Sequence, residues 1–175
     1  LSGLARGVDT ATHRETVNMG GRTIAVLGCG LDIVYPSENK KLFKDILTNG
    51  TIISEFALGE KPDRKNFPQR NRIIAGLSHG TVVVEAGNKS GSILTAFNAI
   101  DQNRDVFAVP GRITDLMSVG TNRLIRHGAF PVFDGEEIID IINDRLFNPI
   151  QGVQKTINYD LSKDEQSIFH HLGHD

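Results

Sequence analysis

Cysteine is nearly absent from the 175-residue sequence, in which Cys29 is the only one. A single cysteine excludes an internal disulfide and favours a reducing compartment. No apolar run approaches the roughly 20 residues that a transmembrane helix needs, and the N-terminus lacks the pattern of a secretory signal peptide. The sequence also contains no internal repeat and no low-complexity tract. These absences predict a cytoplasmic, core-forming protein without a membrane span.

Signatures of catalytic and metal-binding chemistry are missing as well. The C-terminal histidines, His170, His171 and His174, lack a second cluster of ligands, so they predict no metal site. Cys29 has no histidine near it in sequence and is expected to be a small buried hydrophobe. The spacing of a Walker loop is absent, and residues 28–30 lack the third glycine of a dinucleotide-binding fingerprint. The sequence therefore predicts no catalytic residue, no metal and no cofactor.

The charge of the chain is close to balanced, with 19 Lys and Arg against 21 Asp and Glu. A pI near 6.3 argues against a protein that coats nucleic acid with its whole surface, so any site for a polyanion has to be local. Residues 61–72 are such a place, because they hold five basic side chains and Asp63 as the single acidic one. An ordinary solvated surface is the alternative interpretation of this charge run.

Short apolar segments alternate with longer helical ones along most of the sequence. Strands are expected at residues 23–27, 51–56, 81–85, 105–109 and 129–133, and helices at 9–19, 37–49, 68–78, 90–102, 122–127 and 136–146. Asp9 or Thr10 is expected to cap the first helix, and Ser37 the second. This alternation is typical of βαβ units in a parallel sheet, and continuously apolar strands indicate that both faces of the sheet are covered. The predicted fold class is α/β, with a Rossmann-like, doubly wound, mostly parallel sheet.

The sequence predicts three parts. Residues 1–147 form the Rossmann-like domain, which begins at a loop and is expected to lack its first strand. Residues 148–160 form a polar linker. Residues 161–175 begin another helix, in which Ser162 as N-cap and Glu165 three residues later make a capping box. We expect this helix to be the incomplete start of a second domain.

Two glycine-rich loops are candidates for an anion site, because ligands of such sheets bind beyond the C-terminal ends of the strands. Residues 89–92, Lys-Ser-Gly-Ser, open a helix after a strand, so backbone amides, hydroxyls and a lysine can hold a phosphate there. An ordinary helix cap is the alternative. Arg6 lies between glycines in the other loop and can make forked contacts with a phosphate. A salt bridge from Arg6 to Asp9 or Glu85 is the alternative.

The segment Phe67-Pro-Gln-Arg-Asn-Arg72 combines an aromatic ring, an asparagine and two arginines within six residues. Arg70 and Arg72 lie two residues apart on a helix and face differently, so one is expected to meet a phosphate while the other pairs with Glu55 or Glu85. Phe67 can stack on a base or, alternatively, pack in the core. The two glutamates follow strands, where acid–base catalysts often lie, but we favour a role in anchoring arginines.

Seven motifs occur in order along residues 1–135. They are Ser2-Gly-Leu-Ala-Arg-Gly-Val-Asp9, Thr23-Ile-Ala-Val-Leu-Gly28 with Tyr35-Pro36, Ser54-Glu55, Phe67-Pro-Gln-Arg-Asn-Arg-Ile-Ile-Ala-Gly-Leu77, Val84-Glu85-Ala86 with Ser90-Gly-Ser92, Ala108-Val-Pro-Gly111 and Gly120-Thr-Asn122. This series resembles the DprA/Smf family of bacterial DNA-processing proteins. The resemblance implies a Rossmann-like domain that binds single-stranded DNA, dimerises and helps to load the RecA recombinase during natural transformation. It also implies that residues 161–175 open a small winged-helix-like domain.

The sequence and the resemblance together predict a non-catalytic protein that binds and protects single-stranded DNA. The predicted DNA-binding residues are Arg6, Gly7, Lys65, Phe67, Arg70, Asn71, Arg72, Lys89, Ser90, Gly91 and Ser92. The runner-up is a nucleotide-processing enzyme of the phosphoribohydrolase type, by analogy of fold alone, with Glu85 and the turn at residues 87–92 as its site. A third interpretation is an assembly platform, in which the isoleucine-rich helix at residues 136–146 forms a homodimer contact; burial of that helix against the sheet is the alternative.

Overall fold

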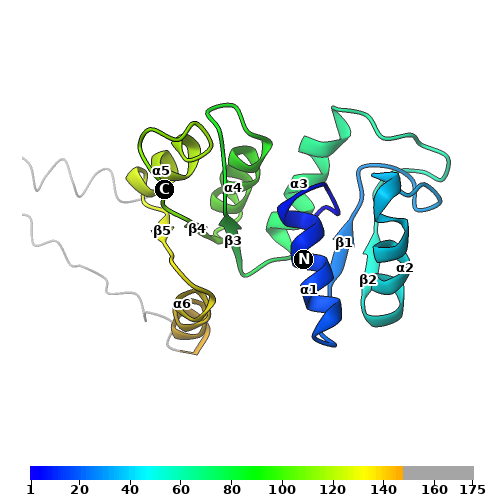
Figure 1. Cartoon of the computed structure of the whole chain (residues 1–175), viewed down its shortest axis with the longest axis horizontal. Coiled ribbons are helices and arrows are strands. Elements are labelled where there is room, and N and C mark those ends of the chain that lie inside the picture. The colour runs from blue at the N-terminus through cyan, green and yellow to red at the C-terminus, as the bar shows by residue number, and fades with distance from the viewer. Residues whose placement is uncertain (148–175) are drawn as a thin grey trace, which may run out of the picture. The chain divides into compact units, whose positions relative to one another are not determined.

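The computed structural model describes residues 1–147, in which helices and strands alternate, and residues 1–142 form one compact unit (Figure 1). The elements are α1 (Val8–Asn18), β1 (Ile24–Val26), the 3-10 helix η1 (Ser37–Asn39), α2 (Lys40–Asn49), β2 (Thr51–Ile53), α3 (Asn66–Gly76), β3 (Gly80–Val83), α4 (Gly91–Asp101), β4 (Asp105–Ala108), α5 (Val119–Arg126), β5 (Phe130–Pro131) and α6 (Gly135–Phe147). Each strand and helix predicted for this range is present, and the α/β fold class is confirmed. The predicted linker at residues 148–160 and the predicted second domain at residues 161–175 lie outside the described residues.

All strand pairs are parallel, as the sequence predicts, but they form two sheets. One contains β1 and β2, and the other has the order β3-β4-β5. Ser2 extends the first sheet by a parallel bridge to Ala25, because its amide donates to the Ile24 carbonyl (3.1 Å) and its carbonyl accepts from the Val26 amide (2.9 Å). Within residues 1–147 no segment pairs with the outer edge of β3, and the sheet is therefore interrupted there.

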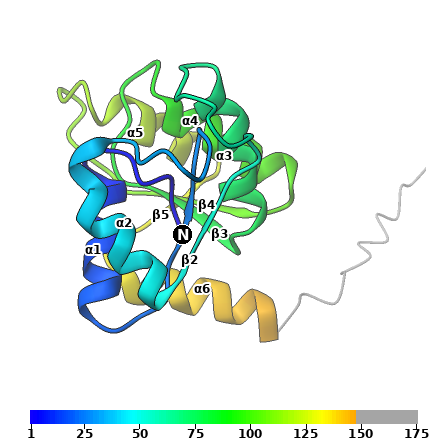
Figure 2. The same ribbon diagram turned by 90° about the vertical axis from the view of Figure 1, so that its right-hand side faces the viewer.

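The helices cover the strands as two packed pairs. Helices α1 and α2 contact each other, as do α3 and α4, and Figure 2 shows the two pairs on either side of the strands. Helix α4 contacts β3 and β4, α2 contacts β2, and α3 contacts β1. This arrangement places the loops that follow β1 next to the beginning of α3.

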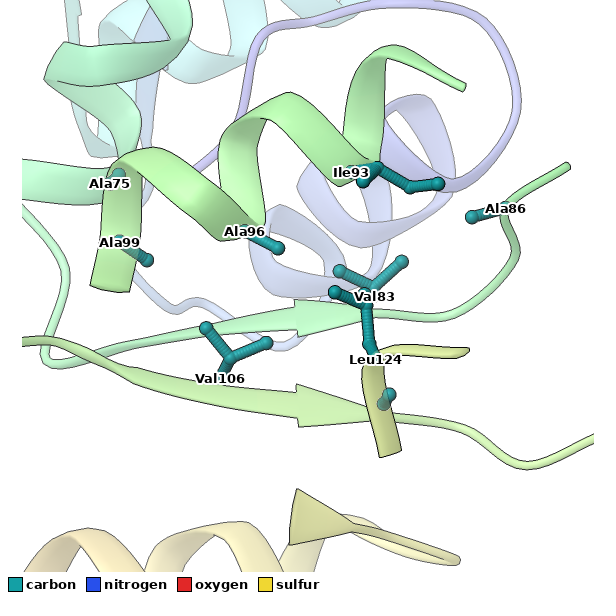
Figure 3. Close-up of a cluster of buried hydrophobic side chains, with 9 residues drawn as sticks. Ala75, Val83, Ala86, Ile93, Ala96, Ala99, Val106 and Leu124 are labelled. Atoms are coloured by element: carbon teal, nitrogen blue, oxygen red, sulfur yellow. The ribbon is translucent and has the colours of Figure 1, made fainter. Parts of the chain in front are cut away.

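Two clusters of buried apolar side chains hold these layers together. The larger surrounds α4 and comprises Ala75, Val83, Ala86, Ile93, Ala96, Ala99, Val106, Ala108 and Leu124 (Figure 3). The small side chains of Ala96 and Ala99 let α4 lie close to Val83 of β3 and Val106 of β4. The other cluster lies between β1 and α2 and comprises Leu4, Ala25, Leu27, Cys29, Leu42, Ile46 and Ile52.

The sequence predicts that both faces of β3 are buried, but only one of them is. Val83 is only 2% exposed, but Val82 and the following Val84 are 40% and 39% exposed. The helices among residues 1–147 therefore cover one face of this segment and leave the other partly open to solvent.

The helix caps agree only in part with the prediction. Ser90 caps α4, because its hydroxyl accepts from the Ser92 amide (3.4 Å). The prediction that Ser37 caps the second helix is wrong, since residues 37–39 form a 3-10 turn and α2 begins after Asn39. The side-chain amide of Asn39 donates instead to the Leu4 carbonyl (3.0 Å), which ties this turn to the first loop.

Helix α6 begins with a side-chain cap, because Asp134 Oδ1 accepts from the amides of Glu136 and Glu137, each at 3.0 Å. None of its residues is fully buried, and Ile139 is 58% exposed. A dimer contact through this helix stays a prediction. No helix within residues 1–147 combines the length and the apolar character needed to cross a membrane.

One buried polar side chain lies outside the loops described below. His13 of α1 is fully buried, its Nδ1 lies 2.7 Å from Thr23 Oγ1, and its Nε2 has no hydrogen-bond partner. Burial lowers the pKa of His13, because the protonated imidazole would lose its hydration there.

Candidate nucleic-acid interface

A cavity of about 360 Å³ lies where β1 ends, and we call it the strand-end pocket. It is bounded by the first loop, by the residues after β1 and by the first turns of α3. Its lining residues are Gly3, Ala5, Arg6, Leu27, Gly28, Cys29, Tyr35, Pro36, Phe67, Arg70 and Asn71. The position agrees with the general rule that ligands of parallel sheets bind beyond the C-terminal ends of the strands.

The first loop, residues 3–6, is held rigidly beside this pocket. Asp9 Oδ2 accepts from the amides of Gly3 (3.0 Å) and Ala5 (3.2 Å). Leu4 adopts a positive φ of 58° and buries its side chain completely. Asp9 was predicted as a helix cap, but its carboxylate is occupied by the loop amides, and Gly7 precedes α1 without a side-chain cap. The loop therefore presents Arg6 from a fixed backbone.

Arg6 reaches the solvent-exposed rim of the pocket and pairs with Glu38, a partner that the sequence interpretation missed. The Nε atom of Arg6 donates to Glu38 Oε1, and the two side chains are 69% and 50% exposed. This hydrogen bond raises the pKa of Arg6 and lowers the pKa of Glu38. Since exposed ion pairs of this kind contribute little free energy, the guanidinium stays available to a stronger anion.

Two aromatic rings form one wall of the strand-end pocket. Tyr35 and Phe67 are stacked, with ring centroids 5.9 Å apart and an interplanar angle of 24°. Tyr35 is 40% exposed and Phe67 is half-buried. Phe67 packs against Tyr35 and also lines the cavity, and its stacking on a base stays a prediction. Tyr35 was absent from the predicted site, and its place in the Tyr35-Pro36 motif was the only sequence signal for it.

Arg70, a predicted DNA-binding residue, is buried rather than exposed. Its side chain is 5% exposed, and its Nη1 donates to the main-chain oxygens of Gly3 (2.7 Å) and Val26. The Cζ atom of Arg70 lies 5.8 Å from the centroid of the Phe67 ring. The guanidinium lines the pocket wall, but most of its donors are already used within the protein.

Arg72 faces away from Arg70, as the helical spacing predicts, and forms an ion pair with Glu55. The predicted role of Glu55 in anchoring an arginine is therefore confirmed. Glu85 is exposed, and its side chain lines neither the strand-end pocket nor the groove described next.

The remaining predicted residues do not line the strand-end pocket. Lys65 is exposed at the start of α3, Lys89 is exposed in the loop before α4, and Gly7 lies before α1 with a φ of 81°. Ser92 lines a second cavity, a groove of about 490 Å³ beside β3, whose lining also includes Arg70 and Asn71. The structure thus brings Arg6, Phe67, Arg70 and Asn71 to one cavity, and places Lys65, Lys89 and the loop at residues 89–92 outside it.

Cys29 lines the strand-end pocket but is buried, as predicted, with 2% of its surface exposed. Its Sγ lies 3.4 Å from the Ile33 carbonyl, and burial raises the pKa of the thiol. A raised pKa leaves little thiolate at neutral pH and argues against a nucleophilic role. Among residues 1–147 no group of three or more His, Cys, Asp or Glu side chains is arranged to hold a metal ion.

Comparison with known proteins finds similarity to a family of DNA-processing proteins. The family model for DNA recombination-mediator protein A matches residues 1–143. The DNA processing protein DprA of Streptococcus pneumoniae is 48% identical over 139 residues, which are 79% of this chain and 49% of that protein. The solved structure of DprA from S. pneumoniae superimposes with a TM-score of 0.73 at 46% identity and covers 79% of this chain and 49% of that one.

The description of a second similar solved structure mentions DNA binding. This structure is DprA from Helicobacter pylori, described as giving insights into a unique single-stranded DNA binding mode. It superimposes with a TM-score of 0.72 at 34% identity and covers 84% of this chain and 65% of that one. The present chain spans about half the length of the S. pneumoniae relative.

Proposed function

The chain belongs to the DNA recombination-mediator protein A family, and on that premise we propose that its strand-end pocket binds single-stranded DNA. One nucleobase stacks on the Tyr35–Phe67 pair, and the adjoining phosphate binds Arg6. The observation that carries this proposal is the presence of an exposed guanidinium and a stacked aromatic pair in one cavity. Binding of single strands without strong sequence preference combines these two elements, because every base has a stacking face and every nucleotide a phosphate.

The dimensions and energetics of the pocket suit a nucleotide. A cavity of about 360 Å³ is at the lower end of the range for small-ligand sites, about 300–1,000 Å³. Stacking of a base on an aromatic side chain contributes roughly 1–3 kcal/mol. A charge-assisted hydrogen bond from Arg6 to a phosphate adds to this, and competition with Glu38 reduces its contribution. Binding should weaken as salt rises, because each neutralised phosphate releases counter-ions.

The other exposed cations fit the flanks of the bound strand. Lys65 and Lys89 lie outside the pocket but remain free to meet neighbouring phosphates along a flexible chain. The description of the H. pylori relative as a single-stranded DNA-binding protein supports this use of the domain. We assign the pocket to one nucleotide and the surrounding lysines to electrostatic attraction.

The proposed activity is binding without catalysis. Glu85, the candidate base of the enzymatic alternative, lines neither the pocket nor the β3 groove. Incubation of the protein with nucleoside monophosphates tests the alternative directly. Sustained release of free base, lost on Glu85→Gln, would replace the binding function by an enzymatic one.

The wider role follows from the family. The family is named for mediating DNA recombination, and the proposed partners are therefore single-stranded DNA and a RecA-type recombinase. The proposed setting is the cytoplasm, where a homodimer protects incoming DNA during natural transformation. The isoleucines of α6, of which Ile139 is exposed and the others are partly buried, are the proposed dimer contact. A mass measurement that finds only monomer at every concentration would remove the dimer from this account.

The experiment that tests the pocket removes the guanidinium of Arg6. Fluorescence anisotropy of a labelled oligo-thymidine measures the affinity of wild type, Arg6→Ala and Arg22→Ala. Arg22 is exposed and precedes β1, whereas the pocket lies where β1 ends. Its removal therefore changes the net charge as much as Arg6→Ala does but leaves the pocket intact. Arg6→Ala should weaken binding by about tenfold and Arg22→Ala by less than about twofold. Equal affinities of the two variants would show that the pocket is not the site.

A further inference from the structure

The buried arginine of α3 connects three segments of the chain. Arg70 is 5% exposed, and its Nη1 donates to the carbonyl oxygens of Gly3 (2.7 Å) and Val26. Its Nε donates to Asn71 Oδ1 (3.2 Å). One guanidinium therefore joins the loop that carries Arg6, the last residue of β1 and helix α3.

Arg70 forms no ion pair with a carboxylate of the described residues. The Arg6–Glu38 and Arg72–Glu55 pairs do not include it, and the charge of Asp9 offsets only part of the effect of its burial. Burial lowers the pKa of Arg70, because the charged guanidinium loses its hydration. An apolar side chain would fill this space at a smaller cost in free energy. The hydrogen bonds to the main chain are thus the feature that distinguishes an arginine here.

Gly3 and Gly28 allow side chains of α3 to approach closely, Gly3 for Arg70 and Gly28 for Phe67. A Cβ atom on Gly3 would overlap the guanidinium of Arg70. A Cβ atom on Gly28 would lie 2.8 Å from Cδ1 of Phe67, whose ring centroid is 5.8 Å from Arg70 Cζ. The side chain of Arg70 therefore sets how far the first loop, the end of β1 and the ring of Phe67 lie from one another.

We propose that Arg70 is a positioning residue for the DNA site. It holds residues 3–6 and the ring of Phe67 at a fixed spacing, so that Arg6 and the aromatic pair meet the same nucleotide. Arg70 acts through these side chains, and its own guanidinium does not touch DNA. The inference rests on the proposed function and removes Arg70 from the predicted contact residues.

The test is a double-mutant cycle between Arg6 and Arg70. Arg70→Lys keeps the positive charge but lacks the planar guanidinium, which binds the two carbonyl oxygens through Nη1 and Asn71 through Nε at the same time. In the wild-type background, Arg6→Ala should weaken binding of labelled oligo-thymidine by about tenfold. In the Arg70→Lys background the same change should cost less than about twofold, because Arg6 is no longer held beside the base.

A variant in the hydrophobic core serves as a control for changes in binding that come from lower stability alone. Ile46→Val removes one methyl group from a fully buried site in the cluster between β1 and α2, away from the pocket lining. It should lower the melting temperature but leave both the affinity and the tenfold effect of Arg6→Ala intact. If Arg70→Lys does not fold, Arg70→Gln replaces it in the cycle, since a neutral amide avoids a buried charge and still donates a hydrogen bond.

The possible outcomes separate the two proposals. If Arg6→Ala has no effect in the wild type, the pocket is not the DNA site and both proposals fail. If Arg6→Ala weakens binding equally in both backgrounds, the function stands and the positioning role is overturned. Loss of the Arg6 effect on changing Arg70, with the effect retained in the Ile46→Val background, supports the positioning role.

Discussion

Replacing Phe67 by leucine removes the aromatic face on which a base would stack while keeping an apolar side chain of similar size. Stacking contributes roughly 1–3 kcal/mol per base, and leucine retains part of the apolar contact, so about 1–2 kcal/mol should be lost. This corresponds to a roughly five- to thirtyfold weaker affinity for single-stranded DNA. The folded protein also loses the ring pair with Tyr35, whose centroid lies 5.9 Å away, and this pair stabilises by about 0.5–1.5 kcal/mol.

The assay for this variant is anisotropy of a labelled oligo-thymidine at a temperature well below the melting transition. The loss of stability should lower the melting temperature by only a few degrees, so both proteins are folded during the titration. Phe97→Leu is the matched control, because Phe97 is 47% exposed on α4 and does not line the pocket. It should bind as the wild type does. An affinity of Phe67→Leu equal to that of the control would refute base stacking at this wall.

Two further predictions concern stability. Burial lowers the pKa of His13 in the folded protein, so the unfolded chain binds a proton at this side chain more readily. The contribution of neutral His13 to folding stability is therefore complete above its ordinary pKa of 6.5 and is lost as the pH falls below that pKa. Between pH 7.5 and pH 5.5, the melting temperature should therefore fall by more in the wild type than in His13→Gln. The control is His79→Gln, which changes an exposed histidine and should behave as the wild type does. Equal falls in all three proteins would exclude His13 as the cause. Gly3→Ala should destabilise the fold by about 1–3 kcal/mol, since its Cβ overlaps the Arg70 guanidinium, and Gly135→Ala, whose Cβ would meet nothing within 4 Å, should change the melting temperature little. A Gly3→Ala variant as stable as Gly135→Ala would show that Arg70 moves aside freely.

The sequence contained enough local information for the elements and for the cap of α4. Alternation of apolar strands with helical segments predicted the order of strands and helices through residue 147. Ser90 caps α4 because a hydroxyl before a helix satisfies an amide wherever that helix packs. Helical spacing predicted that Arg70 and Arg72 face differently and that one of them pairs with Glu55 or Glu85, and Arg72 pairs with Glu55. The elements, the cap and the different directions of the two arginines depend on residues that are close in sequence.

The parts that were not predicted depend on tertiary packing. Spacing along α3 separated Arg70 from Arg72 but did not show which of them faces the interior, because that depends on how α3 lies against β1. Arg6 pairs with Glu38, which no local pattern connects to it, since Asp9 is occupied by loop amides. The break beside β3 likewise depends on which strands pair, and an apolar pattern does not encode this.

Tyrosine fluorescence tests most directly whether single-stranded DNA enters the strand-end pocket. The sequence has two tyrosines and no tryptophan, so in a Tyr159→Phe variant Tyr35 is the only tyrosine and reports on the pocket wall. Addition of oligo-thymidine should quench this fluorescence with the same dissociation constant that anisotropy gives, and Arg6→Ala should shift both curves together. Binding seen by anisotropy without any change in the emission of Tyr35 would place the DNA elsewhere and contradict the account.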